Sequence, residues 1–401
     1  MDQQDKHQAA ATQAETPRHI AALDGVRGIA ILLVLLFHAN GGGQSGSWAV
    51  RFVSGLLRVG WCGVTLFFVL SGFLITNILW TSKGQPKWWR RFYVRRALRI
   101  FPLYYLALLA VLIALLVEHR FHEGLRPLAI YAVYLQNLLL PQGFYVQIPF
   151  MVHHFWSLAV EEQFYLVWPA LLVAMPNVKS ARWLCVVVFV LSLAMRCAVL
   201  TQGWGGMVNS TPVHMGELTA GGWLAMVLKE RPVWIRRLRP AAMPVFAFTA
   251  LLMAFCAVTA GGLEEVKPLM YTVGLATLSV AGMMMIVQAL ESPGFAKAMA
   301  WRPLQHLGVI SYGVYVYHGF FYIQWTRMAE RMLPHGSHNE QRLLISVLMV
   351  VLGCAAAEVS YRWFEKPILQ LKDRLAPSAA PAKTVMNDVW AQDAPSGETP
   401  R

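Results

Sequence analysis

The sequence predicts an all-α, polytopic membrane protein with about ten transmembrane helices and one further re-entrant or interfacial helix. Of its 401 residues, 57% are hydrophobic and only 14% are charged, whereas soluble domains contain about 45–50% apolar and about 25% charged residues. The mean hydropathy is +0.47. Long apolar runs separated by short basic segments account for this excess. These observations argue against a soluble enzyme, a disordered chain and a nucleic-acid-binding domain.

Ten apolar runs are candidates for the spanning helices, because a helix needs about 20 apolar residues to cross roughly 30 Å of hydrocarbon. An eleventh apolar segment, residues 126–140, is shorter and contains Gln136 and Asn137. We expect this segment to be the re-entrant or interfacial helix. The predicted spans cover about residues 20–39, 57–80, 98–118, 156–175, 182–201, 213–228, 241–260, 269–290, 304–326 and 342–363.

The distribution of Lys and Arg predicts the orientation of the chain. The formal net charge is +13, and in membrane proteins such cations collect in cytoplasmic loops, so they do not indicate a nucleic-acid partner. The most basic connections are residues 83–99 and 229–239. Placing both in the cytosol also places both termini there, provided that residues 126–140 do not cross.

Both ends of the chain are expected to lie outside the membrane domain, which is predicted to cover residues 20–370. Residues 1–19 are polar and predict a loose cytosolic tail, and residues 371–401 are rich in Ala, Pro and Ser. A segment of that composition buries too little apolar area to offset the entropy lost on ordering. We therefore expect residues 371–401 to form a disordered cytosolic tail.

The first predicted helix carries two ionisable residues on one face. Arg27 and His38 are eleven residues apart, which is about three helical turns and about 16 Å along the axis. Asp24 precedes Arg27 by one turn and is placed to pair with it. His38 is suited to act as a general base because the reference pKa of histidine is near 6.5. The alternative is that Arg27 reaches the membrane boundary and His38 ends the helix.

The basic segment 83–99 interleaves seven Lys and Arg residues with aromatic residues and contains no acid. Arg96 and Arg99 are one turn apart at the start of the third predicted span, where two guanidinium groups can hold phosphates bidentately. Arg95 lies beside them. Anchoring to anionic membrane lipid is the alternative role of this segment.

The fourth predicted span begins with Ser157 and two adjacent acids, Glu161 and Glu162. Acids near a helix start usually cap it. Adjacent residues of a helix point about 100° apart, so the two carboxyl groups are not expected to work as an acid–base pair. No metal site is expected, because His153 and His154 are an isolated pair and the five cysteines form no metal-binding spacing.

Three further ionisable residues fall within predicted spans, where each is costly and therefore a candidate for function. His318 lies near the middle of the ninth span and needs a partner, either as a core histidine or as a functional one. Arg196 and Glu217 are interpreted as a structural pair or as residues at the membrane boundary, rather than as catalytic residues.

Taken in order, the motifs resemble the acyltransferase-3 family of integral-membrane acyltransferases. The ordered set runs from about residue 20 to residue 370. The matching pieces are the arginine-to-histidine spacing of the first helix, the second helix, an Arg-x-x-Arg motif followed by Pro, the Trp-Ser-Leu to Tyr segment, and two late signatures. They occupy residues 24–38, 63–75, 96–102, 156–165, 311–318 and 365–367.

The resemblance implies transfer of an acyl group, most commonly acetyl from acetyl-CoA in the cytosol, to a hydroxyl of an extracytoplasmic carbohydrate or lipid-linked glycan. It implies a multi-pass protein of the bacterial inner membrane, with membrane lipid as a further partner and no metal. The residues that we expect to carry out catalysis are His38, Arg27, Glu161 and His318, and those that we expect to hold the donor are Arg96, Arg99, Arg95 and Arg27.

A proton-coupled membrane transporter is the alternative function, because it would also place His and Glu within spans. Many transporters contain internal repeats and paired broken helices. The sequence shows no obvious repeat between its halves, which favours acyl transfer.

Overall fold

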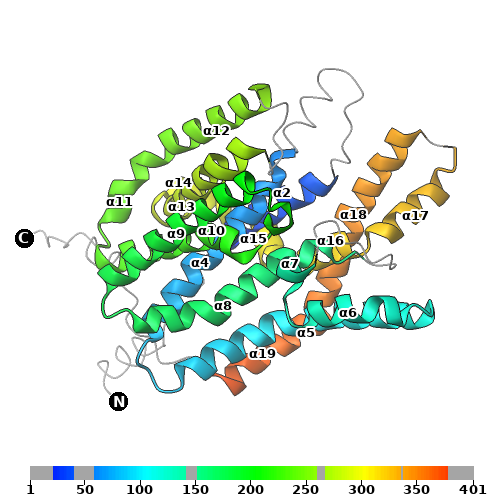
Figure 1. Ribbon diagram of the computed structural model, residues 1–401, viewed down its shortest axis with the longest axis horizontal. Helices are drawn as coiled ribbons and strands as arrows, with labels where there is room; N and C mark the ends of the chain where they lie inside the picture. The colour runs from blue at the N-terminus through cyan, green and yellow to red at the C-terminus, as the bar shows by residue number, and fades with distance from the viewer. Residues whose placement is uncertain (1–20, 40–57, 141–150, 260–266, 336, 378–401) are drawn as a thin grey trace, which may run out of the picture.

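All regular structure in the described part of the chain is helical (Figure 1). Seven helical stretches are long and apolar enough to cross a membrane. The predicted all-α, polytopic architecture is therefore confirmed. By length and apolar composition, the described residues contain seven candidate spans, fewer than the ten crossings predicted. The computed structural model describes residues 21–39, 58–140, 151–259, 267–335 and 337–377. The seven stretches are Ala21–Ala39, Val59–Ser82, Trp88–Val117, Val178–Thr201, Trp234–Cys256, Met270–Glu291 and Glu340–Leu375.

Within each described range, the elements follow one another with short connections. The α-helices are α2 (Ala21–Ala39), α4 (Cys62–Ser82), α5 (Trp88–Val117), α6 (Phe121–Ala132), α7 (Gln136–Leu139), α8 (Trp156–Ala174), α9 (Val178–Thr201), α10 (Thr211–Glu230), α11 (Trp234–Leu238), α12 (Ala242–Thr259), α13 (Leu275–Glu291), α14 (Pro293–Met299), α15 (Arg302–Val309), α16 (Ser311–Phe320), α17 (Tyr322–Met332), α18 (His338–Ser360) and α19 (Lys366–Leu375). Short 3₁₀ or π turns are η1 (Val59–Trp61), η2 (His153–Phe155), η3 (Gly205–Met207), η4 (Arg239–Ala241), η5 (Met270–Gly274) and η6 (Tyr361–Glu365).

The predicted span at 304–326 is wrong as a single helix. It is divided into α15, α16 and α17, with breaks at Ile310 and Phe321. The apolar part, α16, has ten residues and is therefore only about 15 Å long. The helix that follows it contains Arg327, Glu330 and Arg331, so the polar residues that flank α16 shorten the apolar run.

The predicted spans at 156–175 and 213–228 are continuous helices, α8 and α10, which lie outside the seven apolar stretches. Both contain charged residues that lower their hydropathy, among them the half-buried Glu161 of α8 and the buried Glu217 of α10. Helices of 19 and 20 residues are nevertheless long enough to span about 30 Å.

The segment 126–140, expected to form one re-entrant or interfacial helix, instead forms parts of two short helices, α6 and α7. The Gln136 amide donates to the Phe155 carbonyl over 2.9 Å. The Gln163 amide of α8 donates to Asn137 Oδ1 over 2.8 Å and to the Tyr134 carbonyl over 2.6 Å. The two polar residues that argued against a crossing therefore fix this segment against α8.

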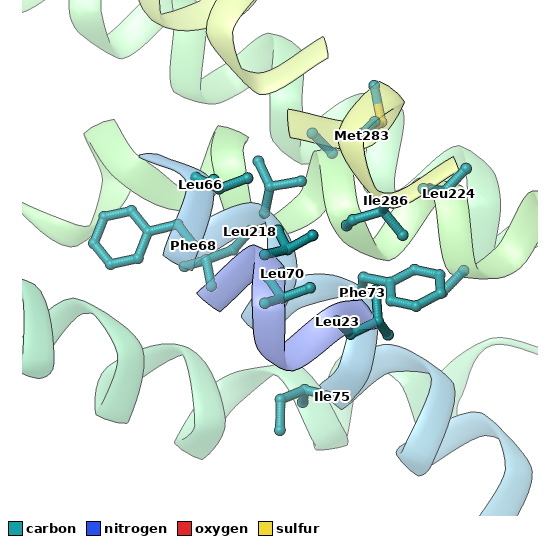
Figure 2. Packing of buried hydrophobic residues seen from close by; sticks show 14 of the residues in the cluster. Leu23, Leu66, Phe68, Leu70, Phe73, Ile75, Leu218, Leu224, Met283 and Ile286 are labelled. Atoms are coloured by element: carbon teal, nitrogen blue, oxygen red, sulfur yellow. The ribbon is translucent and has the colours of Figure 1, made fainter. Parts of the chain in front are cut away.

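The centre of the bundle is the close crossing of α4 and α10, which pack against each other more extensively than most helix pairs. A Cβ on Gly72 would lie 1.7 Å from the Leu218 carbonyl oxygen, and one on Gly221 would lie 1.9 Å from that of Val69. Small residues let helix backbones approach in this way. Figure 2 shows the apolar side chains that surround the crossing, including Phe73, Leu224 and Ile286.

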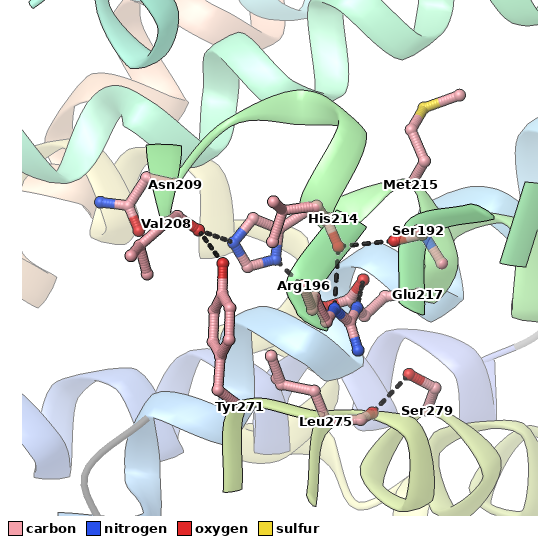
Figure 3. A network of polar contacts seen from close by, with 12 residues as sticks. Ser192, Arg196, Val208, Asn209, His214, Met215, Glu217, Tyr271, Leu275 and Ser279 are labelled. Atoms are coloured by element: carbon pink, nitrogen blue, oxygen red, sulfur yellow. Dashed lines mark hydrogen bonds and ion pairs between the residues drawn. The ribbon is translucent and has the colours of Figure 1, made fainter. Parts of the chain in front are cut away.

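A buried ionic network joins α9 to α10 (Figure 3). Arg196 Nη2 lies 2.6 Å from Glu217 Oε2, and His214 Nδ1 lies 3.0 Å from the other oxygen of that carboxylate. Arg196 also donates to the Val213 carbonyl, and His214 Nε2 donates to the Val208 carbonyl. The structure thus pairs Arg196 with Glu217 and adds His214 to them.

The basic residues predicted as a loop belong largely to a helix, because α5 begins at Trp88 and continues to Val117. At the other end of the chain, α19 continues to Leu375. Arg95 donates to Asp373 over 2.9 Å, so the first residues of the segment expected to be a disordered tail are helical and packed on α5. The predicted tail at 1–19 and residues 378–401 of the tail predicted at 371–401 lie outside the described residues.

Candidate functional site

A cavity opens between α2, α4, α5, α8 and α16. Its free volume is about 710 Å³, including its open mouth. Four residues predicted from the sequence line it together: Arg27, Arg96, Arg99 and Glu161. The remaining lining residues are Val64, Phe67, Phe68, Ser71, Ile100, Ser157, Leu158, Tyr165, Ser311, Tyr312 and Tyr315.

The three arginines of the cavity differ in their partners. Arg27 Nη1 lies 3.2 Å from Asp24 Oδ1, as the one-turn spacing predicts. Arg96 packs its guanidinium over the Tyr165 ring at 5.5 Å. Neither Arg96 nor Arg99 forms an ion pair or hydrogen bond within the described part of the chain. Two guanidinium groups without protein acceptors on one cavity wall form a candidate site for an anion.

Arg95 lies elsewhere, although the sequence places it in the same cluster. It does not line the cavity. Its guanidinium donates to Asp373 over 2.9 Å and to the Ala376 carbonyl over 3.0 Å. Of these three arginines of α5, Arg95 therefore holds α19, whereas Arg96 and Arg99 face the cavity.

The two adjacent acids of α8, Glu161 and Glu162, point in different directions. Ser71 of α4 donates to Glu161 Oε1 over 2.6 Å, and the Tyr165 hydroxyl lies 3.4 Å from Ser71 Oγ. Glu161 lines the cavity and Glu162 does not, in agreement with the expected 100° between them. The capping interpretation is wrong, because α8 begins at Trp156 without a side-chain cap.

Two hydroxyl groups continue the cavity wall away from the arginines. Ser157 Oγ and the Tyr315 hydroxyl are 2.5 Å apart. Tyr315 also donates to the His154 carbonyl over 2.6 Å. Its ring lies 5.5 Å from that of His318, measured between centroids. This wall therefore connects the arginine end of the cavity with a group of imidazoles.

His38 and His318, which are far apart in the sequence, have ring centroids 4.8 Å apart. His38 is exposed at the end of α2, whereas His318 is fully buried. His38 Nδ1 donates to the Val34 carbonyl over 2.9 Å, and His318 Nδ1 donates to that of Tyr315 over 2.7 Å. A carbonyl oxygen only accepts, so these contacts place the hydrogen on Nδ1 and leave Nε2 of each ring as a lone-pair base.

The site thus has two ends. Arg27 and His38 belong to the same helix, and eleven residues of α-helix separate them by about 16 Å. Arg96 and Arg99 lie with Arg27 around the cavity, while His318 lies with His38. The cations therefore lie at one end of this arrangement and the two imidazoles at the other.

Sequence reasoning missed the polar residues that complete the wall. Ser71, Tyr165 and Tyr315 lie within motifs recognised as segments, but no spacing indicated that Ser71 meets Glu161 or that Tyr315 meets Ser157. The described residues contain no group of three or more His, Cys, Asp or Glu side chains arranged to hold a metal ion.

Comparison with known proteins agrees with the motifs. The acyltransferase-3 family model, described as an acyltransferase domain, matches residues 20–361. The putative peptidoglycan O-acetyltransferase YrhL of Bacillus subtilis is 31% identical over 369 residues, which cover 88% of this chain and 55% of that protein. Peptidoglycan O-acetyltransferase OatA of Listeria monocytogenes is 30% identical, with 88% and 56% covered.

A third relative is O-acetyltransferase OatA of Staphylococcus aureus strain NCTC 8325. It is 24% identical over 382 residues, which cover 88% of this chain and 58% of the relative. The chain therefore spans little more than half the length of these curated relatives. No solved structure matches the chain.

Proposed function

Since the chain belongs to the acyltransferase-3 family, we propose that it is a membrane O-acetyltransferase that moves an acetyl group from acetyl-CoA to a hydroxyl of a carbohydrate. The observation that carries the proposal is a pair of guanidinium groups that have no hydrogen-bond acceptor among the described residues and lie at one end of a cavity whose wall leads to two imidazole bases. Family membership favours this function over the proton-coupled transporter considered from the sequence.

Arg96 and Arg99 are proposed to hold the phosphates of acetyl-CoA. Both face the cavity and have no acceptor in the described ranges of the chain, so their hydrogen bonds are available to a ligand. A hydrogen bond to a charged group contributes about 1.5–3 kcal/mol. Arg27 adds a third positive charge but is already paired with Asp24, so its contribution is expected to be smaller.

The wall between the two ends fits the pantetheine arm of the donor. That arm carries amide groups and a hydroxyl, and the wall offers the hydroxyls of Ser157, Tyr165 and Tyr315. Glu161 accepts from Ser71 and is proposed to fix this part of the wall beside Arg96. With the phosphates at the arginines, the arm directs the thioester toward His38.

His38 is proposed to be the general base. Its bare Nε2 takes the proton of the acceptor hydroxyl while that oxygen attacks the thioester carbonyl, and the proton then passes to the departing sulfur. A positioned base contributes about 10²–10⁴-fold to such a step. His38 is exposed and His318 is buried behind it, so the acceptor meets His38 first.

The acceptor is proposed to be a cell-wall glycan or its lipid-linked precursor, because two relatives are named as peptidoglycan O-acetyltransferases. We further propose an inner-membrane location with both termini in the cytosol, a donor that binds from the cytosol, and an acceptor outside. The distribution of Lys and Arg supports this orientation.

The proposal is tested with the purified chain in lipid nanodiscs, radiolabelled acetyl-CoA and peptidoglycan fragments as acceptors. We expect alkali-labile label on the carbohydrate, since O-acetyl esters are hydrolysed by base. Label that stays in acetyl-CoA with every carbohydrate offered, in a preparation that still binds CoA, would contradict the assignment.

A further inference from the structure

We propose that the first turn of α16, with the hydroxyl of Ser311, is a further subsite for a phosphate group of acetyl-CoA, beside Arg96 and Arg99. The inference rests on the proposed function and deepens it, because it adds an uncharged group from another helix to the donor site. Ser311 is the first residue of α16 and lines the cavity. The sequence gave the motif at residues 311–318 as a segment and assigned no role to its serine.

The Ser311 side chain is buried and has a free hydroxyl. The residue is 4% exposed, and its hydroxyl forms no hydrogen bond within the described part of the chain, although most buried polar groups are hydrogen-bonded. Ser311 Oγ is not one of the described atoms that are both fully enclosed and unpaired. Because the residue lines the cavity, a ligand there reaches this hydroxyl and supplies the missing partner.

The helical hydrogen-bond pattern is interrupted immediately before Ser311. The Ile310 amide donates to the His306 carbonyl at the end of α15, and the Val314 amide donates to the Ile310 carbonyl at the start of α16, each over 3.1 Å. The first N–H groups of a helix have no acceptor within that helix, and no side chain caps the start of α16. These N–H groups and the positive end of the helix dipole favour an anion.

A hydrogen bond joins the first turn of α16 to the helix that carries the unpaired arginines. The Tyr312 hydroxyl donates to the Ile100 carbonyl of α5 over 2.7 Å. Ile100 follows Arg99 directly in the chain, and both residues line the cavity with Tyr312. The start of α16 and Arg99 therefore lie at the same end of the cavity.

The chain also passes α2 just before it enters α16. A Cβ on Gly308 of α15 would lie 1.8 Å from the Asp24 carbonyl oxygen, and the Asp24 side chain pairs with Arg27. Among the described residues that line the cavity, three arginines face a single carboxylate, that of Glu161. This excess of positive charge attracts an anion to the same end.

One acid packs against the first turn of α16, but on another face of the helix. Glu365 accepts a hydrogen bond from Ser360 over 3.0 Å, and its Oε1 would lie 3.0 Å from a Cβ on Gly313. Gly313 follows Ser311 by two residues, which is about 200° around the helix. Neither Gly313 nor Glu365 lines the cavity, so this carboxylate leaves the proposed subsite free.

Phosphate is the part of acetyl-CoA whose chemistry fits these donors. A phosphate presents several anionic oxygens, so guanidinium groups from α5 and a hydroxyl from α16 bind different oxygens of one group. CoA carries such oxygens in its pyrophosphate and in its ribose 3′-phosphate. The thioester lies elsewhere, because the imidazole end begins at His318, seven residues beyond Ser311 and therefore about 10 Å along α16.

The experiment measures the Kd for CoA by isothermal titration into wild type and Ser311→Ala in nanodiscs. We expect Ser311→Ala to raise this Kd about 10- to 100-fold, as for the loss of one hydrogen bond to a charged group. The Tm should not fall, because the hydroxyl has no partner to lose within the described part of the protein. An unchanged Kd would overturn the subsite.

A second titration with dephospho-CoA, which lacks the 3′-phosphate, identifies the group that is bound. An equal rise in Kd for CoA and dephospho-CoA supports a contact with the pyrophosphate. A rise for CoA alone supports a contact with the 3′-phosphate.

Ser279→Ala is the matched control. Ser279 is 0% exposed, donates to the Leu275 carbonyl within its own helix and does not line the cavity. It should keep the Kd of wild type for CoA. A rise equal to that in Ser311→Ala would contradict the inference, because the effect would then follow from losing any buried serine hydroxyl.

Ser311→Asp separates binding of an anion from a role in starting the helix. Acids are favoured in the first turn of a helix, so this variant should keep the Tm, while its carboxylate repels a phosphate. We expect its Kd for CoA to exceed that of Ser311→Ala. If Ser311 only started α16, Ser311→Asp would bind CoA as wild type does, and that result would refute the subsite.

The two proposals fail differently. If wild type binds no CoA and transfers no acetyl group, the proposed function is wrong. If wild type transfers acetyl and Arg99→Gln weakens CoA binding, but Ser311→Ala and Ser311→Asp bind CoA as wild type does, only the subsite on α16 is wrong.

Discussion

Replacing Arg99 by Gln should weaken the binding of acetyl-CoA while leaving the fold intact. The side chain lines the cavity and has no acceptor within the described part of the protein. Its removal therefore leaves no buried carboxylate without a partner, which is the usual reason why losing a charged residue destabilises a fold.

The magnitude follows from the hydrogen bonds that the guanidinium makes to a phosphate. One charge-assisted hydrogen bond contributes about 1.5–3 kcal/mol, so Arg99→Gln should raise the Kd for CoA about 10- to 100-fold. Arg99→Lys keeps the charge and loses the planar fork, so its Kd should lie between those of wild type and Arg99→Gln. The double variant Arg96→Gln/Arg99→Gln should lose less binding free energy than the two single variants lose together, because both residues bind the same group.

The assay is isothermal titration of CoA into the protein in nanodiscs at two salt concentrations. Arg90→Gln is the matched control, because Arg90 is an exposed residue of the same helix and does not line the cavity. Salt should weaken binding to wild type more than to Arg99→Gln, since screening acts on the charge that the variant lacks. An Arg99→Gln protein with the Kd of wild type would refute the phosphate assignment.

Three further predictions concern the fold and its orientation. Arg196→Met should destabilise the protein by about 3–5 kcal/mol, because Glu217 loses its 2.6 Å partner; thermal unfolding followed by tryptophan fluorescence measures this, and an unchanged Tm would contradict it. Gly221→Ala should cost about 1–3 kcal/mol, because its Cβ would meet the Val69 carbonyl, whereas Gly206→Ala, in open space, should not lower the Tm. A reporter fused at the C-terminus should be found in the cytosol, and one found outside would contradict the predicted orientation.

Much of the cavity's arginine end could be predicted from the sequence, because it depends on spacing within single helices. Arg27 follows Asp24 by one turn, and Arg96 precedes Arg99 by one turn; both pairs keep the geometry that helical periodicity gives. Neighbouring Arg95 shows the limit of this reasoning. Whether it faces the cavity or α19 depends on where Asp373 lies, and local spacing contains no information about that contact.

The imidazole end of the site could not be predicted from the sequence, because the contact between His38 and His318 depends on long-range packing. The sequence treated His38 and His318 separately and placed His154 in a loop, whereas the breaks at Ile310 and Phe321 bring α16 against α2 and η2. The prediction of one continuous span over residues 304–326 missed those breaks. They follow from polar residues on both sides of a ten-residue apolar core and from the packing of α15 on α2.

The most direct test of the proposed mechanism measures binding and transfer on the same preparations of wild type and His38→Ala. We expect His38→Ala to bind acetyl-CoA with a Kd close to that of wild type, because His38 does not line the cavity that holds the arginines, and Arg27 of that cavity lies about 16 Å from His38 along α2. Transfer to the carbohydrate should fall about 10²–10⁴-fold, the contribution of a general base. Near-normal turnover in His38→Ala would contradict the role of His38 and make His318 the next candidate for the base.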